Sequence, residues 1–154
     1  MNDEPPCSRA RAPSGMRHQA RRCLLQALYA WQQNEGALPV PQILAEFLRR
    51  TKVGDESYFR EVLPGAVADV ALARSLCAPS LDRPWEQVDA VERAILILAV
   101  HELRAHPEIP GRVVLNEAIE LAREFGAPDS HRFINAVLDR VRQTLSTAPP
   151  AARG

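Results

Sequence analysis

The stretch Ala94-Ile95-Leu96-Ile97-Leu98-Ala99-Val100 decides the fold class, because it is apolar on every side. Asp89-Ala90-Val91-Glu92 lies just before it and has the acid-x-x-Glu form of a capping box, so we expect a helix that begins here and runs to about Ala105. A helix that is apolar all round is buried, which predicts the central helix of a bundle. The stretch is much shorter than the roughly 20 residues that cross a membrane.

Segments with helical periodicity flank this stretch on both sides. We expect helices from Met16 to about residue 35, over 41–50, over 56–63 and 66–77 with a break or kink at Pro64-Gly65, over 113–125, and after Asp129. No alternation typical of strands and no internal repeat is found. The prediction is an all-α bundle of six to seven helices over residues 16–147, with a disordered arginine-containing arm at 1–15 and a flexible tail at 148–154.

Charge is unevenly distributed along the 154 residues, although the formal net charge is zero. The segment from Pro5 to Asn34 contains five arginines and no acidic residue, a formal charge of +5, whereas Glu35 to Gly154 carries −3. Eighteen of the 19 cations are arginine, whose planar fork suits phosphate and base stacking. Two interpretations stay open: a solvated tail with a coding bias toward arginine, or a nucleic-acid-binding arm joined to an acidic, protein-binding body.

No motif for catalysis, metal binding or cofactor binding is found. His101-Glu102 begins like the zinc motif H-E-x-x-H, but position 105 is alanine. Asp129-Ser130-His131 contains three triad residue types, but triads assemble in space and not as neighbours. The three cysteines are odd in number and far apart, which favours a reducing cytoplasm, with Cys23 and Cys77 as packing residues. We also expect no secretory leader.

Three blocks of sequence together are distinctive. They are Arg21-Arg22 followed by Gln26-Ala27-Leu28-Tyr29-Ala30-Trp31, then Asn116-Glu117-Ala118-Ile119-Glu120-Leu121-Ala122, then Asp129-Ser130-His131-Arg132-Phe133-Ile134-Asn135. From about Ala20 to Val141 the chain closely resembles the NusB family of bacterial transcription antitermination factors. The resemblance implies an all-helical fold of two packed subdomains, without catalysis.

The resemblance also implies partners. Members of the family bind the boxA element of ribosomal RNA leaders as single-stranded RNA, together with the ribosomal protein that acts as NusE. This pair joins NusA, NusG and RNA polymerase, so that the polymerase reads through terminators. Two alternatives remain: the N-terminal module of a ribosomal RNA cytosine methyltransferase, which needs a long α/β domain beyond Gly154, and a self-associated homodimer that masks its RNA face.

The family's functional positions map onto two sets of residues. The RNA-binding set implied by the resemblance is Arg17, Arg21, Arg22, Tyr29, Arg123, Phe125, Asp129, His131 and Arg132; Arg9 and Arg11 are not aligned. The first helix has an apolar stripe made of Ala20, Leu24, Ala27, Leu28 and Trp31. Tyr29 lies off this stripe, which allows base stacking or half-buried packing. For the partner face we expect Glu86 and Glu92, although Glu92 also fits the capping box.

Overall fold

The computed structural model describes residues 12–147, so the predicted arm up to residue 11 and the predicted tail from 148 lie outside the described residues. The described part contains seven α-helices and no strand, which confirms the all-α prediction. The helices form two compact units, one up to Pro64 and the other from Gly65 onward, with the division falling inside one helix.

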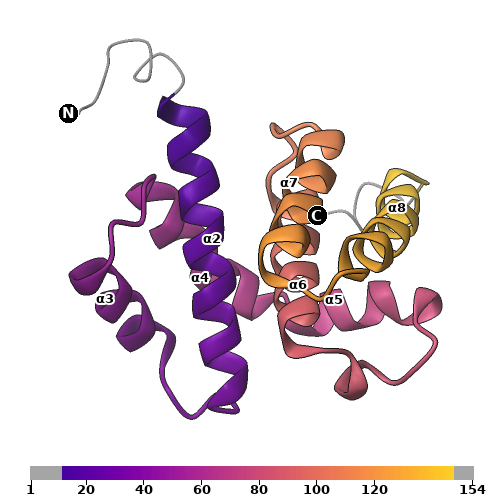
Figure 1. The fold of residues 1–154 in the computed structure, drawn as a ribbon, viewed down its shortest axis with the longest axis horizontal. Helices are drawn as coiled ribbons and strands as arrows, with labels where there is room; N and C mark the ends of the chain where they lie inside the picture. Colours follow the sequence, from indigo (N-terminus) through magenta and orange to yellow (C-terminus); the bar gives the residue numbers. More distant parts are fainter. Residues whose placement is uncertain (1–11, 148–154) are drawn as a thin grey trace. The chain divides into compact units, whose positions relative to one another are not determined.

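The first unit consists of α2 (Ala12–Gln33), α3 (Val40–Arg50) and the first part of α4 (Glu56–Ala68) (Figure 1). Helix α2 begins four residues before the expected Met16. It ends before a turn in which Glu35 and Gly36 have positive φ values of 53° and 77°. The expected helix over 41–50 is confirmed, with one extra residue at its start.

The core of the first unit is built from the apolar stripe of α2 and the facing sides of α3 and α4. Leu24 and Leu28 of α2 are fully buried. Phe47 of α3 and Phe59 of α4 stack with their ring centroids 5.8 Å apart. The stripe identified in the sequence is therefore the packing face of α2, and the residues beside it are left for other contacts.

The expected break at Pro64-Gly65 is wrong, because α4 continues through both residues to Ala68. Proline removes one backbone donor and crowds the carbonyl oxygen four residues before it, yet α4 accommodates Pro64. The break falls at Asp69, where φ is −95° and ψ is 10°. The amide of Asp69 still donates to the carbonyl oxygen of Gly65 at 3.0 Å, while its carboxylate bonds to side chains of another helix.

The second unit is organised around α6, as the sequence predicted. Its elements are α5 (Val70–Cys77), the short 3₁₀ helices η1 (Ala78–Ser80) and η2 (Trp85–Gln87), α6 (Ala90–Ala105), α7 (Gly111–Phe125) and α8 (Ser130–Thr147). Every residue of α6 from Ala94 to Glu102 is buried. Helices α5, α7 and α8 all pack against α6 (Figure 1).

The start of α6 is capped as expected. The carboxylate of Asp89 accepts hydrogen bonds from the backbone amides of Val91, at 3.0 Å, and Glu92, at 3.2 Å. These bonds satisfy two donors that a helix N-terminus otherwise leaves unpaired.

Candidate nucleic-acid interface

One face of α2 presents a cation and an aromatic ring together. Arg22, Gln26 and Tyr29 follow one another at i, i+4 and i+7, so they lie on one side of the helix, with about 10 Å of axial rise from first to last. Arg22 is half-buried, Gln26 is exposed, and Tyr29 is 38% exposed. The guanidinium of Arg22 bonds to Gln19 at 2.9 Å, and the Tyr29 ring lies two turns further along the helix. A stacking ring and a cation on one side of a helix are the groups that single-stranded nucleic acid requires.

The other two predicted arginines of α2 lie against Tyr58 of α4. The guanidinium carbon of Arg17 is 3.8 Å from the centre of the Tyr58 ring, and that of Arg21 is 5.7 Å away. Arg17 also donates from Nε to Oδ2 of Asp55 at 3.1 Å. Its side chain stays about one-third exposed, at 34%. Arg21 is only 4% exposed, which favours a packing role over direct contact with RNA.

The loop between α3 and α4 ties this end of α2 in place. Gly54 has a φ of +79°, and a Cβ atom there would lie 2.4 Å from the carbonyl oxygen of Met16, so only glycine fits. The amide of Asp55 donates to the same Met16 oxygen at 3.0 Å. Gln19 donates to the carbonyl oxygen of Lys52 at 3.0 Å and accepts from Arg22 at 2.9 Å.

Sequence reasoning missed this arrangement. Asp55 lies just before α4 and caps it by accepting from the Tyr58 amide at 3.1 Å, a contact between neighbours in the sequence. Its second bond, to Arg17, joins residues 38 positions apart, and no local pattern in the sequence pairs them.

The remaining predicted RNA-binding residues surround the turn between α7 and α8, in the second unit. Ser130 fixes this turn, because its hydroxyl donates to Oε2 of Glu92 at 2.6 Å and accepts from the Ala127 amide at 3.0 Å. Gly126 packs so closely that an added Cβ would lie 2.8 Å from Cβ of Ser130. The turn is therefore a rigid support for the side chains around it.

The side chains around this turn differ in exposure. Arg123, Asp129 and Arg132 are exposed, whereas Phe125 and His131 are half-buried. Arg123 lies 3.6 Å from Glu120 in an exposed ion pair, which contributes little to stability and leaves the guanidinium accessible. The structure thus gathers five predicted residues along one short stretch of the second unit, and Arg17, Arg21, Arg22 and Tyr29 along α2 of the first.

The two predicted partner-facing acids have different surroundings. Glu86 lies on η2, is exposed, and pairs with Arg74 of α5. A hydrogen bond to its own backbone, together with Arg74, holds the pKa of Glu86 below its ordinary value, so it stays charged. Glu92 is half-buried and holds Ser130, so it supports the α7–α8 turn in addition to standing in the first turn of α6.

A partly buried polar cluster, made of Asp69, His101 and Arg104, joins the break after α4 to α6. Oδ2 of Asp69 lies 2.7 Å from Nδ1 of His101, 3.0 Å from Nε of Arg104 and 2.8 Å from its Nη2. Burial by itself raises the pKa of Asp69, but hydrogen bonds from His101 and Arg104 lower it overall. His101 is therefore committed to a structural contact.

The described residues include no group of three or more His, Cys, Asp or Glu side chains placed to hold a metal ion. Cys23 and Cys77 are buried in the helices, as expected for packing residues. Burial raises the pKa of the Cys77 thiol to about 12, which keeps it protonated and unreactive near neutral pH.

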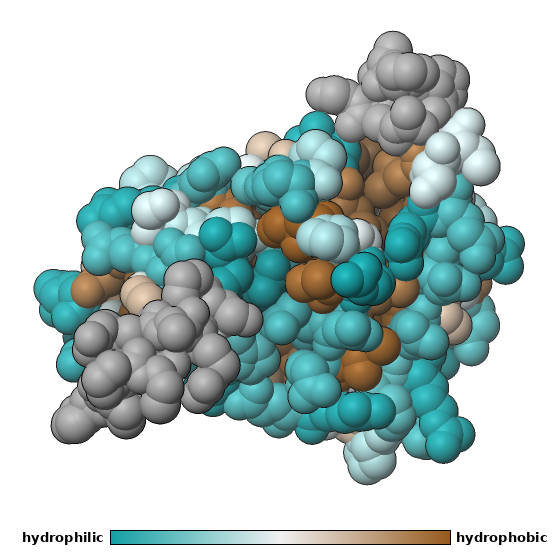
Figure 2. Space-filling model, turned by 90° about the horizontal axis from the view of Figure 1, so that it is seen from above, coloured by the Kyte–Doolittle hydropathy of each residue, from teal (hydrophilic) through white to brown (hydrophobic). Residues whose placement is uncertain are grey.

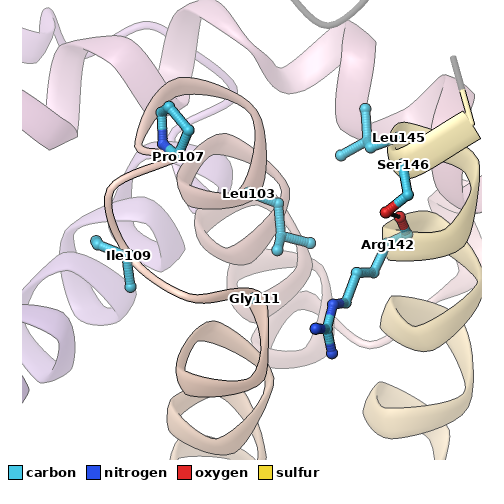
Figure 3. A pocket seen from close by; sticks show the side chains of 7 residues that line it. All are labelled: Leu103, Pro107, Ile109, Gly111, Arg142, Leu145 and Ser146. Atoms are coloured by element: carbon cyan, nitrogen blue, oxygen red, sulfur yellow. Dashed lines mark hydrogen bonds between the residues drawn. The ribbon is translucent and has the colours of Figure 1, made fainter.

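The second unit has a pocket of about 310 Å³ among the ends of α6, α7 and α8 (Figure 3). Leu103, Ile109 and Leu145 contribute apolar walls, and the side chain of Arg142 extends toward Gly111. None of the predicted site residues lines this pocket. Among the described residues that line it, Arg142 is the one charged side chain.

The molecular surface is mainly hydrophilic on the face drawn in Figure 2, where hydrophobic surface shows as patches among hydrophilic side chains. The exposed large hydrophobic side chains of the described part are Met16 and Tyr29. No single helix of that part has the length and apolar character needed to cross a membrane; only the bent pair 56–68 and 70–80 meets those criteria jointly.

Taken together, the fold and the site define an all-α protein of two helical units whose first helix carries a half-buried arginine and an exposed tyrosine on one side. The model of the NusB family matches residues 18–143. The chain belongs to the NusB family, which confirms the resemblance seen in the sequence.

Relatives and a solved structure agree with this assignment. The transcription antitermination proteins NusB of Serratia proteamaculans and Yersinia enterocolitica are each 44% identical over 131 residues, covering 84% of this chain and 94% of theirs. The structure of T. maritima NusB matches with a TM-score of 0.73 at 26% identity, covering 89% of this chain and 95% of that one. Family members are non-catalytic transcription antitermination factors, so membership supports a role in antitermination without catalysis.

Proposed function

We propose that this protein is a transcription antitermination factor that binds boxA-type single-stranded RNA together with ribosomal protein NusE. The pair then joins NusA, NusG and RNA polymerase during ribosomal RNA transcription, in the cytoplasm. The observation that carries the proposal is one side of α2, where half-buried Arg22 and exposed Tyr29 lie two turns apart. The relatives named as antitermination proteins support the general role.

The contribution of the α2 residues to RNA binding can be estimated from their chemistry. Each phosphate neutralised by an arginine contributes about −0.7 to the slope of log K against log salt, so Arg17 and Arg22 together account for about −1.4. Stacking of one unpaired base on Tyr29 adds roughly 1–3 kcal/mol. Arg21, being buried, contributes no phosphate contact in this proposal.

The α7–α8 turn is a separate region of the second unit for which we also propose RNA contact. Arg123 and Arg132 are exposed cations there, and the exposed carboxylate of Asp129 repels phosphate but accepts hydrogen bonds from base amino groups. A site that combines cations for the backbone with an acceptor for a base edge favours binding to a particular sequence over binding to any strand.

The NusE surface that we propose includes Glu86. This carboxylate is exposed and charged on η2, and the segment from Glu35 to Gly154 carries a net −3. A basic ribosomal protein complements such a surface, which speeds association and fixes orientation.

The test is a titration of fluorescently labelled boxA RNA with this protein, with and without NusE, across a salt series. A scrambled RNA of the same composition controls for sequence preference. We expect Tyr29→Ala to weaken binding about five- to 150-fold, from the loss of one stacked base, with the helical signal unchanged.

Failure to bind boxA RNA at low salt with NusE present would refute the proposal. Light scattering on the same samples distinguishes a homodimer, because a dimer that RNA neither binds nor dissociates would indicate that self-association masks the site.

A further inference from the structure

The guanidinium of Arg17 is held on two sides and open on the third. Its Nε donates to Oδ2 of Asp55 at 3.1 Å, and its flat face lies 3.8 Å from the centre of the Tyr58 ring. Its terminal nitrogens, Nη1 and Nη2, have no hydrogen-bond partner among the side chains that the structure describes. These two nitrogens form the end of the fork that binds a phosphate through two parallel hydrogen bonds.

The groups that hold Arg17 are themselves fixed. Asp55 is anchored through its amide to the carbonyl oxygen of Met16 and through Oδ1 to the amide of Tyr58. Tyr58 is 5% exposed, so its ring is packed in place under the arginine. These contacts favour one orientation of Arg17 before any ligand arrives, whereas an ordinary surface arginine samples many rotamers.

We infer that Asp55 and Tyr58 are positioning residues that present the fork of Arg17 to an RNA phosphate. This inference rests on the proposed RNA-binding function and assigns it two residues that do not themselves touch RNA. Asp55 has a role here that its charge alone would not suggest, since a carboxylate close to the site repels phosphate. The contact with Asp55 favours RNA binding because the Arg17 side chain loses its conformational entropy during folding and not when RNA binds.

The test is a double-mutant cycle on boxA RNA affinity, using the full chain with Asp55→Asn, Arg17→Ala and the combined variant. Asparagine keeps an oxygen that accepts from the Tyr58 amide, so the cap of α4 is preserved while the charged contact with Arg17 is lost. We expect Asp55→Asn to weaken binding about two- to tenfold, the cost of ordering one long side chain, although removal of a negative charge favours RNA. In the Arg17→Ala background the same change should have no weakening effect.

Matched controls come from the same helix. Glu56→Gln removes a neighbouring negative charge that is paired with Arg60 and not with α2, so it measures the effect of charge alone. Arg60→Ala removes an exposed arginine and controls for Arg17→Ala. Tyr58→Leu gives a second cycle with Arg17→Ala, and circular dichroism shows whether that buried substitution leaves the fold intact.

Three results would overturn the inference: tighter binding by Asp55→Asn, equal weakening by Asp55→Asn in both backgrounds, or no loss of affinity with Arg17→Ala. Equal weakening would mean that Asp55 acts through general stability. If the wild-type protein does not bind boxA RNA, the proposed function fails together with this inference. If the wild type binds and the cycle is additive, only the inference fails.

Discussion

Gly65 is the position at which a single methyl group should reveal how tightly the buried His101 ring of the polar cluster is packed. A Cβ atom added there would lie 2.5 Å from Cε1 and 2.8 Å from Nε2 of His101. The His101 ring is 5% exposed and is held by Asp69 at 2.7 Å, so it has little freedom to move aside. Gly65→Ala must therefore shift either this ring or the backbone of α4.

Two opposing effects set the magnitude. Alanine is favoured over glycine in a helix by up to about 1 kcal/mol, whereas forcing extra atoms into a packed interior costs about 1–3 kcal/mol. Gly15 provides a matched control, because it also lies in a helix but has no atom within 4 Å of its added Cβ. We expect Gly65→Ala to be less stable than Gly15→Ala by about 1–3 kcal/mol, or roughly 2–12 °C in melting temperature for a chain of this size.

Thermal and urea unfolding followed by circular dichroism measure this difference. Repeating the change in a His101→Ala background removes the ring that the new methyl group meets, so the cost of Gly65→Ala should disappear there. The reasoning is refuted if Gly65→Ala is as stable as Gly15→Ala, or if its cost is the same with and without the His101 ring.

Three further expectations concern the groups that the structure buries. Burial raises the pKa of Asp69, but hydrogen bonds from His101 and Arg104 lower it overall. The ionised carboxylate therefore stabilises the folded protein fully above the ordinary carboxyl pKa of about 3.9, and this stabilisation is lost as the pH falls through the lower folded-state pKa. Asp69→Asn should make the free energy of unfolding in urea depend less on pH in that acid range. Arg21→Ala should lower the free energy of unfolding more than Arg22→Ala does, while leaving the salt slope of RNA binding unchanged; a reduced slope would return Arg21 to the RNA site. With its pKa raised to about 12 by burial, Cys77 should resist iodoacetamide at pH 8 until denaturant is added, as mass spectrometry of the alkylated peptide would show.

The central helix could be predicted from the sequence because its causes are local. Seven consecutive apolar residues can satisfy their backbone bonds and bury every side only inside a bundle, and Asp89 supplies the cap from the adjoining residues. The break in α4 was misplaced for the opposite reason. The cost of Pro64 is visible in the sequence, but the demand that His101 and Arg104 make on Asp69 comes from residues more than 30 positions away.

In the candidate site, too, local sequence predicted some features, whereas others depend on residues far away in the chain. Tyr29 lies off the apolar stripe, so the sequence left both base stacking and half-buried packing open, and in the structure its side chain is 38% exposed. Arg21 lies only one position from Arg22, about 100° around the helix, and that offset places it toward Tyr58. A run of arginines therefore indicates an electrostatic function without showing which members face the ligand.

Substitutions at Glu92 and Glu86 have to be interpreted differently, because one carboxylate supports the fold and the other lies on the surface. Glu92 was expected to contact a partner protein, but its carboxylate accepts the Ser130 hydroxyl that fixes the α7–α8 turn. Removing Glu92 would disturb the support of Asp129 and Arg132, so weaker partner binding by that variant would not show direct contact. The side chain of Glu86 is exposed and forms a surface ion pair with Arg74, whose loss costs little stability. Glu86 is therefore the position at which an electrostatic contact with the partner can be measured separately from the rigidity of the turn.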